Sequence, residues 1–192
     1  MKIKALASLC SKAKQIILYD DGGQQWAGDG MAAYLLPGAF GRLNTGALTA
    51  IFDIPADKAA DMLIRNIDMP AGYDTEDEGD GETELDFDTD CRILHNGRDM
   101  VPCKTPDGKV YLIQAKYIKP LTDCDGLRLS LRHMSGDGRP YITAKDGMFL
   151  TAIIMPITLG EPLSAWMYTV YNGAVKARSY EGGELNGEEP GM

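Results

Sequence analysis

Asp-Gly and Asn-Gly pairs recur between short apolar runs along this chain, and they constrain its fold more than any other feature. They occur at residues 21–22, 29–30, 96–97, 107–108 and 146–147. Such pairs favour tight hairpin turns because glycine adopts a positive φ without steric cost. The pattern therefore predicts antiparallel strands at residues 16–19, 24–27, 31–36, 92–95, 99–103, 109–113, 127–134, 139–145 and 148–155.

Three segments have helical patterns. Residues 2–15 lack Gly and Pro and space their apolar side chains at helical intervals, and residues 114–124 predict a second, shorter helix. A third helix is predicted over residues 56–67, after Pro55, while residues 48–54 fit a strand or a short helix. The order of elements predicts an α+β fold, an antiparallel sheet with helices on one face.

Two of the predicted strands differ in their patterns of burial. Leucines at 127, 129 and 131 alternate with Arg128, Ser130 and Arg132, which predicts one buried face and one wet face. Residues 149–154 are apolar at nearly every position, so this strand is predicted to be covered on both faces. Pro156 would end its ladder because proline has no backbone N–H to donate.

The acidity of the chain is concentrated in one tract. The chain has 192 residues and a net charge of -9, and ten of its 28 acidic residues lie between Asp74 and Asp90 without a Lys or Arg. The other 18 face 19 basic residues, so the rest of the chain is nearly neutral. With so few apolar residues, the segment 71–90 is predicted to be a mobile acidic loop. Leu85 stands where an EF-hand loop needs its bidentate glutamate, so no metal site is predicted.

These patterns predict one α+β domain over residues 1–160, with halves 1–70 and 91–160 joined by the acidic loop 71–90. Residues 161–178 predict an amphipathic helix, and residues 179–192 a disordered tail. The apolar runs are too short to span a membrane, which needs about 18 residues, so no membrane partner is expected. The four cysteines lack a CxxC pair, which favours reduced thiols and a cytoplasmic protein.

No catalytic motif stands out. Asp20, Asp21 and Asp29 could form a carboxylate pair, but each lies in a glycine turn where aspartate serves the backbone. The two histidines, His95 and His133, have no ligand at metal-binding spacing, and no GxSxG motif occurs. We therefore expect no enzyme activity and no cofactor.

Lysines mark the first two predicted helices. Residues 2–15 and 114–121 contain six lysines and no carboxylate: Lys2, Lys4, Lys12, Lys14, Lys116 and Lys119. A lysine-only face in an acidic chain suits contact with phosphates, which is indifferent to base sequence. The alternative is that these are ordinary solvated helix faces.

Residues 110–159 carry a resemblance to a known family. Tyr117 and Ile118 open the short helix, Leu129 and Leu131 lie in the next strand, then follow Pro140 and the pair Met155-Pro156. This order resembles the closing half of a domain of the bacterial sliding clamp, the beta subunit of DNA polymerase III. The resemblance implies a DNA-clamp-like domain of two halves whose helices line a ring around double-stranded DNA.

On that resemblance, Lys12, Lys14, Lys116 and Lys119 would face phosphates. Met155 and Pro156 would help to bind a partner such as a replication protein, with Trp166 covering that groove or mediating assembly. Clamp chains carry two or three such domains, whereas this one has room for one, so a ring would need a homo-oligomer. The expected function is a noncatalytic clamp-like DNA-associated or replication-related protein. The small, acidic chain is also similar to bacterial phage and mobile-element proteins. The alternative is an α+β protein-interaction module with no nucleic-acid role.

Overall fold

A computed structural model of the chain describes the backbone of residues 1–183 and the side chains of residues 1–178. Its strands are β1 (Gln15–Asp20), β2 (Gln25–Gly28), β3 (Ala32–Leu35), β4 (Leu63–Asp68), β5 (Thr83–Phe87), β6 (Ile93–His95), β7 (Arg98–Lys104), β8 (Val110–Gln114), β9 (Leu127–His133), β10 (Pro140–Asp146), β11 (Phe149–Ile154) and β12 (Ile157–Thr158). Its helices are α1 (Ile3–Ala13), α2 (Thr45–Ile51), α3 (Ala56–Ala60) and α4 (Glu161–Gly183), with 3-10 turns η1 (Gly38–Phe40), η2 (Ala115–Tyr117) and η3 (Lys119–Leu121).

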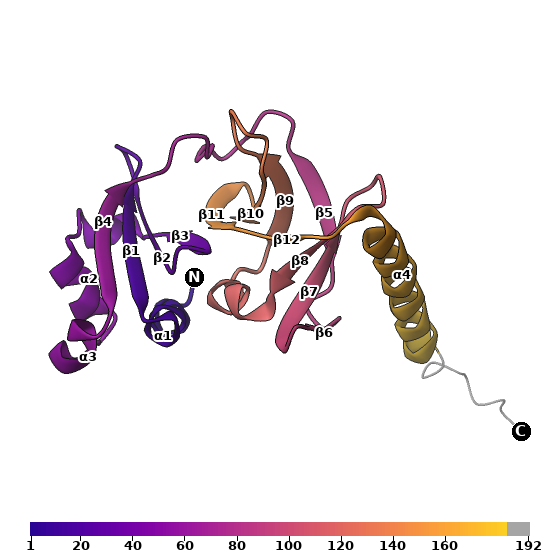
Figure 1. Cartoon of the computed structure of the whole chain (residues 1–192), viewed down its shortest axis with the longest axis horizontal. Coiled ribbons are helices and arrows are strands. Elements are labelled where there is room, and N and C mark those ends of the chain that lie inside the picture. Colours follow the sequence, from indigo (N-terminus) through magenta and orange to yellow (C-terminus); the bar gives the residue numbers. More distant parts are fainter. Residues whose placement is uncertain (184–192) are drawn as a thin grey trace, which may run out of the picture.

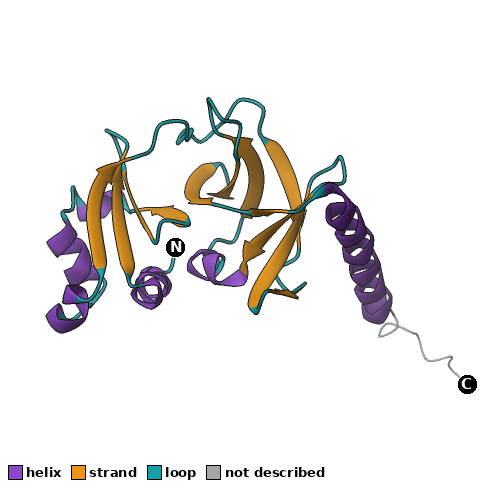
Figure 2. Ribbon diagram, in the orientation of Figure 1, coloured by secondary structure: helices purple, strands orange, loops and turns teal. Residues whose placement is uncertain are grey.

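The predicted α+β fold is confirmed (Figures 1 and 2). The strands pair in the order β12-β8-β7-β5-β9-β10-β11-β3-β2-β1-β4, with β6 beside β7. Every pair is antiparallel except β1 with β4. All nine strands predicted from the turn pattern are present, each within one residue of its predicted start and two of its end.

The middle of the sheet has a two-part order. In each half a helical segment precedes three antiparallel strands: α1 precedes β1, β2 and β3, and η2 with η3 precedes β9, β10 and β11. The last strands of the two halves pair with each other through Ile154 opposite Ala32 and Ala152 opposite Tyr34. Figure 1 shows α1 and the η2–η3 segment side by side below this junction.

The helix predicted over residues 56–67 is wrong in its second part. Helix α3 ends at Ala60, and Leu63 to Asp68 form β4, which pairs in parallel with all six residues of β1. The backbone N–H of Leu63 begins this pairing by donating to the carbonyl of Lys14. The open edge of β1 satisfies the backbone groups that a helix would otherwise have paired within itself, so tertiary pairing overrides the local preference. Residues 45–51 form a helix capped by Asn44.

The sheet is covered on both faces. One face contributes Leu129, Leu131 and Ile142 to a core with α1, α2, η2 and η3, which we call the helical face. The opposite, outer face carries a second cluster that includes Tyr141, Leu150 and residues of β1 and β2. Strand β11 contributes to both clusters, so the prediction that it is covered on both faces is confirmed from Leu150 to Ile154, but its first residue, Phe149, is 66% exposed.

The acidic segment corrects two predictions. It was expected to be a mobile loop, but residues 83–87 form β5, which lies between β7 and β9 and buries Leu85. Residues 74–82 fold against the outer face of β9 and β10. The face of β9 that was predicted to be wet is therefore covered at Ser130 and Arg132, which are only 4% and 2% exposed, whereas Arg128 is exposed as predicted. Hydrogen bonds to buried cations replace the apolar contacts that the segment lacks.

Helix α4 packs on the other side of β8 from the main core, where Met167 joins Met100, Val110 and Leu112. It continues to Gly183, so the tail predicted from residue 179 is wrong for residues 179–183; residues 184–192 lie outside the described part of the chain. None of the helices in residues 1–183 is both long and apolar enough to cross a bilayer.

Candidate nucleic-acid interface

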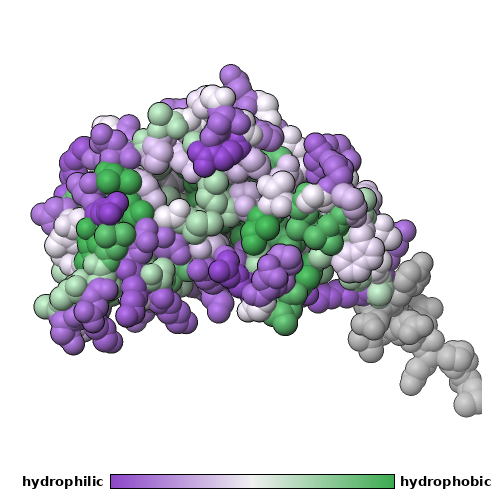
Figure 3. All heavy atoms as spheres, in the orientation of Figure 1, coloured by the Kyte–Doolittle hydropathy of each residue, from purple (hydrophilic) through white to green (hydrophobic). Residues whose placement is uncertain are grey.

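The two lysine-bearing segments lie against each other. The backbone N–H of Lys2 donates to the carbonyl of Pro120 at 2.7 Å, and Lys2 Nζ donates to the hydroxyl of Thr122 at 2.8 Å. The N-terminal amine of Met1 pairs with Asp123 at 3.1 Å. These contacts place α1 and η3 in one layer on the helical face. Hydrophilic residues gather along this lower edge in Figure 3.

The charged side of α1 is the side turned away from the core. Leu6, Leu9 and Cys10 are buried against the sheet, and at 100° per residue Lys4 lies about 165° and Lys12 about 115° around the helix from the centre of this buried group. Between the two lysines lie the short, exposed side chains of Ser8 and Ser11, which would let a flat surface approach the helix.

Three of the four predicted phosphate-facing lysines are available. Lys12, Lys14 and Lys119 are exposed, and none makes an ion pair with a residue of the described chain. From Lys4 to Lys14 the helix spans about 15 Å, a length along which B-DNA presents roughly nine phosphate charges. Asp123 and Asp125, just after η3, are the carboxylates nearest to this surface in sequence.

Lys116 is held differently from the other three. Its Nζ lies 3.7 Å from Asp29 Oδ2 and 4.6 Å from the centre of the Tyr117 ring. Asp29, in the β2–β3 turn, is buried and accepts a 3.2 Å hydrogen bond from the Tyr117 hydroxyl. Burial and the adjacent Asp29 carboxylate raise the pKa of Tyr117, so it stays a neutral donor. Lys116 thus neutralises a buried carboxylate and is less available to phosphate.

The acidic segment lies mostly on the other side of the sheet. Arg132, on the outer face of β9, donates to the carbonyls of Asp74, Glu76 and Asp77. Glu82 accepts from Arg132 Nη2 at 2.7 Å and from Lys145 Nζ at 2.5 Å. The sheet therefore separates residues 74–82 from the lysines of α1.

The end of the acidic tract approaches the lysine layer more closely. Asp88 and Thr89 line an open hollow together with Ile118 and Leu121 of the η2–η3 segment. Asp88 is occupied there by an ion pair with Arg178 of α4 at 2.7 Å. The acidic tract is therefore separated more fully from the lysines of α1 than from the η2–η3 segment.

The contacts of Arg132 and Lys145 with Glu82 could not be predicted from the sequence. Burial of Glu82 opposes its ionisation, but hydrogen bonds from Lys145 and Arg132 outweigh this effect and lower the pKa of Glu82. Gly79 leaves room for the guanidinium, because a Cβ there would overlap the Nε and Cζ atoms of Arg132. The sequence feature that pointed to these contacts is the position of Arg132 in the period-two pattern of β9, in a chain with a local excess of carboxylates.

The predicted partner-binding residues do not form one site. Met155 lines a small hollow with Tyr19, Met31 and Tyr73, and its sulfur accepts from the Tyr73 hydroxyl at 3.2 Å. Pro156 follows at the end of β11. Trp166 lies on α4, which contributes no residue to that hollow and stands at the far end of the molecule in Figure 1. Trp166 therefore does not cover the groove beside Met155.

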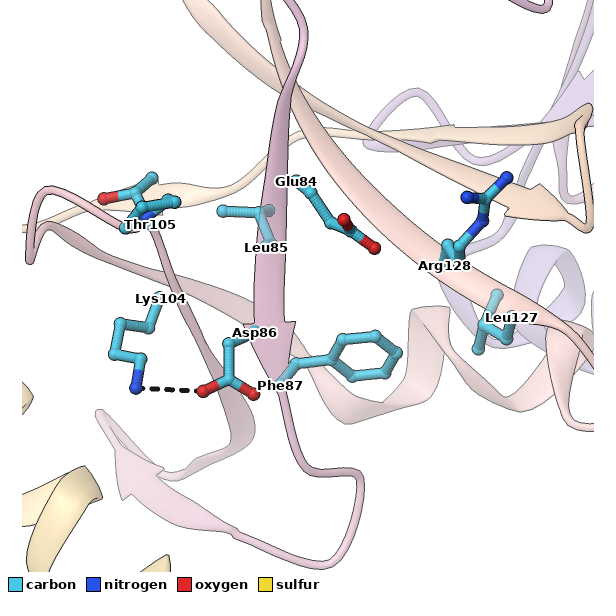
Figure 4. A pocket seen from close by; sticks show the side chains of 9 residues that line it. Glu84, Leu85, Asp86, Phe87, Lys104, Thr105, Leu127 and Arg128 are labelled. Atoms are coloured by element: carbon cyan, nitrogen blue, oxygen red, sulfur yellow. Dashed lines mark ion pairs between the residues drawn. The ribbon is translucent and has the colours of Figure 1, made fainter.

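A larger open hollow, of about 470 Å³, lies where β5 changes partners (Figure 4). Leu85 is the last residue of β5 paired with β9, and Asp86 is the first paired with β7. Phe87 and Leu127 line the gap, and Asp86 pairs with Lys104 at 2.9 Å. The residues that line the hollow include no histidine, cysteine or serine. No three potential metal-binding side chains come together in residues 1–178.

We find no match to the chain among known protein families, curated proteins or solved structures.

Proposed function

We propose that this chain is a noncatalytic, clamp-like protein that contacts the phosphate backbone of double-stranded DNA through α1 and η3. The single observation that carries the proposal is the contact between the two lysine-only segments, which brings together the segments that carry the exposed residues Lys4, Lys12, Lys14 and Lys119. A surface that presents lysines, without a helix or strand that contacts base edges, suits binding that does not depend on the DNA sequence.

The order of strands supports the clamp-like part of the proposal. A helical segment followed by three antiparallel strands occurs twice, and the two sets meet at β3 and β11. Both helical segments lie on the same face, which is the arrangement that the resemblance to sliding clamps implies. The net charge of -9 opposes DNA binding overall, but much of the acidic tract is behind the sheet. We place the protein in the cytoplasm and in DNA replication of a bacterial phage or mobile element as part of the same proposal.

The test is a measurement of binding to a short DNA duplex of arbitrary sequence. A triple variant, Lys12→Glu, Lys14→Glu and Lys119→Glu, should lose at least tenfold in affinity. The matched control changes three exposed cations away from this surface by the same total charge: Arg65→Glu, beside Ile17 on the outer face, Lys109→Glu and Arg139→Glu. The control should bind within about threefold of the original chain, because distant exposed charges are screened beyond roughly 10 Å.

Salt provides the second readout. If about four lysines neutralise phosphates, the logarithm of the affinity should fall with a slope near -4 against the logarithm of salt concentration. That slope corresponds to a loss of about 150- to 250-fold between 50 and 200 mM salt. Equal losses in the two triple variants, or binding that does not respond to salt, would refute a phosphate-facing α1.

A second candidate function is an interaction module with no nucleic-acid role. The observation that favours it is the apolar surface of α4, where Trp166 is 58% exposed. Absence of DNA binding at 50 mM salt, together with a protein contact made through α4, would favour this candidate over the first.

A further inference from the structure

Helix α4 is apolar on two separate faces. One face packs on the body: Met167 and Tyr171 are 5% and 3% exposed, and Ser164 Oγ accepts from the backbone N–H of Val110. Lys104 extends this contact with a 3.0 Å hydrogen bond to Asn172. The other face is the α4 stripe, composed of Leu163, Trp166, Val170, Gly173 and Ala177. The two faces lie about 110° apart around the helix, so docking on the body leaves the α4 stripe uncovered.

The spacing of the α4 stripe is that of a helix-pairing seam. Its members follow one another at intervals of three, four, three and four residues, the a and d positions of a heptad pattern. Leu163, Trp166 and Val170 are 41%, 58% and 43% exposed. Gly173 faces open space, because a Cβ added there would meet no atom within 4 Å.

The large side chains at one end of the α4 stripe are complementary in size to the small residues at its other end. The large side chains lie in the first half of α4, and the small residues Gly173 and Ala177 lie in the second half. In an antiparallel pair of two such helices, Trp166 of one copy can face Ala177 of the other, and Val170 can face Gly173. A parallel pair would instead set Trp166 against Trp166 and leave a gap at Gly173.

We propose that the α4 stripe is the contact surface of a homodimer, in which α4 pairs antiparallel with α4 of a second copy of this chain. Such a contact is isologous and closes at two copies. The body of each copy lies on a different side of its α4 from the stripe, so the two bodies remain on the outside of the helix pair. The contact is independent of the proposed DNA surface, which lies on α1 and η3.

The size of the surface sets the expected strength. The three large side chains expose roughly 300 Å² per copy, so a dimer with its smaller neighbours buries about 1,000 Å² in total, the low end for a specific interface. We therefore expect a weak dimer, with a dissociation constant on the order of 10 μM.

The experiment is sedimentation velocity of the full chain from about 1 to 500 μM, a range over which mass action should shift it from monomer to dimer. Gly173→Leu fills the open space at this position and should weaken the dimer at least tenfold. The same change replaces a glycine inside a helix with a better helix former, so the fold should not suffer. Trp166→Ala should weaken the dimer by a similar factor.

Ala165→Leu is the matched control, since Ala165 is exposed and lies about 120° from both apolar faces. It adds the same leucine as Gly173→Leu and should leave dimerisation unchanged. A chain that stays monomeric at every concentration would overturn the proposal. So would a tighter dimer for Gly173→Leu, the result expected of parallel pairing. Assemblies larger than a dimer would also overturn it, because an isologous contact closes at two copies. Loss of DNA binding has no bearing on these outcomes.

Discussion

Replacing Arg132 with methionine tests whether the buried cation holds the acidic segment on the outer face of the sheet. The Arg132 side chain is 1% exposed and donates to Glu82 and to the backbone carbonyls of Asp74, Glu76 and Asp77. Methionine keeps much of the length of the side chain and removes all of these bonds. Removing one member of a buried ion pair costs about 3–5 kcal/mol. The low end applies here, because Lys145 still pairs with Glu82 and water can reach the freed carbonyls.

A loss of about 3 kcal/mol corresponds to a fall in Tm of roughly 6–12 °C for a chain of this size. Urea unfolding would measure the loss, and amide hydrogen exchange would locate it, with faster exchange expected in residues 74–82. The control is Arg139→Met, since Arg139 is 65% exposed and its pair with Asp137 should contribute less than about 1 kcal/mol. A loss for Arg132→Met no larger than that of the control, with exchange in residues 74–82 unchanged, would refute this account of the segment.

Two further predictions concern the same side of the sheet and the β2–β3 hairpin. The lowered pKa of Glu82 means that its ionised form stabilises the fold above its unfolded pKa and that this stability is lost as pH falls through the folded pKa. Glu82→Gln should therefore be less stable than the original chain at pH 7, and the difference measured by urea unfolding should shrink below about pH 4.5. Gly28→Ala should cost more than about 3 kcal/mol, because a Cβ there would overlap the carbonyl of Ala32, whereas Gly38→Ala, which meets open space, should be close to neutral in the same thermal melt.

The hairpin strands could be predicted because their causes are local. Gly22, Gly30, Gly97, Gly108 and Gly147 all have positive φ, the conformation that the turns require and that glycine adopts freely. Period-two burial also gave the inward face of β9, with Leu129 and Leu131 in the core. The period-two pattern could not show whether the other face of β9 is exposed or covered, because this depends on a segment about fifty residues earlier in the chain.

Two of the three strands that were not predicted, β4 and β5, have a common reason. Leu63 to Asp68 follow a helical start, and the alternation of acidic with less polar side chains in residues 83–87 is short and lies within a strongly acidic tract, so neither segment was predicted to be a strand. Each is a strand because a neighbouring strand presents an open edge: β1 for the first, and β7 with β9 for the second. Backbone pairing across a sheet is available to almost any sequence once the partner edge is in place.

The candidate site was predicted in part. The lysines were found from composition. Lys12 is exposed on a helix that buries its apolar side, Lys14 is exposed at the C-cap of that helix, and Lys119 is exposed beside the buried Pro120 and Leu121 of η3. The capture of Lys116 by Asp29 was not predictable, because it joins the β2–β3 turn to a segment 87 residues later. The separation of Met155 from Trp166 is likewise set by the path of β12, which carries the chain to β8 before α4 begins.

The sequence by itself determined the nine strands of the hairpins, their turns and the placement of positive charge on two short helical segments, because these depend on backbone conformations and side-chain periods within a few residues. Only the tertiary structure decided that these two segments lie together, that the acidic segment is packed behind the sheet, and that α4 has an uncovered apolar stripe. Each of these outcomes depends on which distant groups meet. The position of a charged or apolar side chain can be recognised from the local sequence. Its contact partner is determined only when the sheet brings the two residues together.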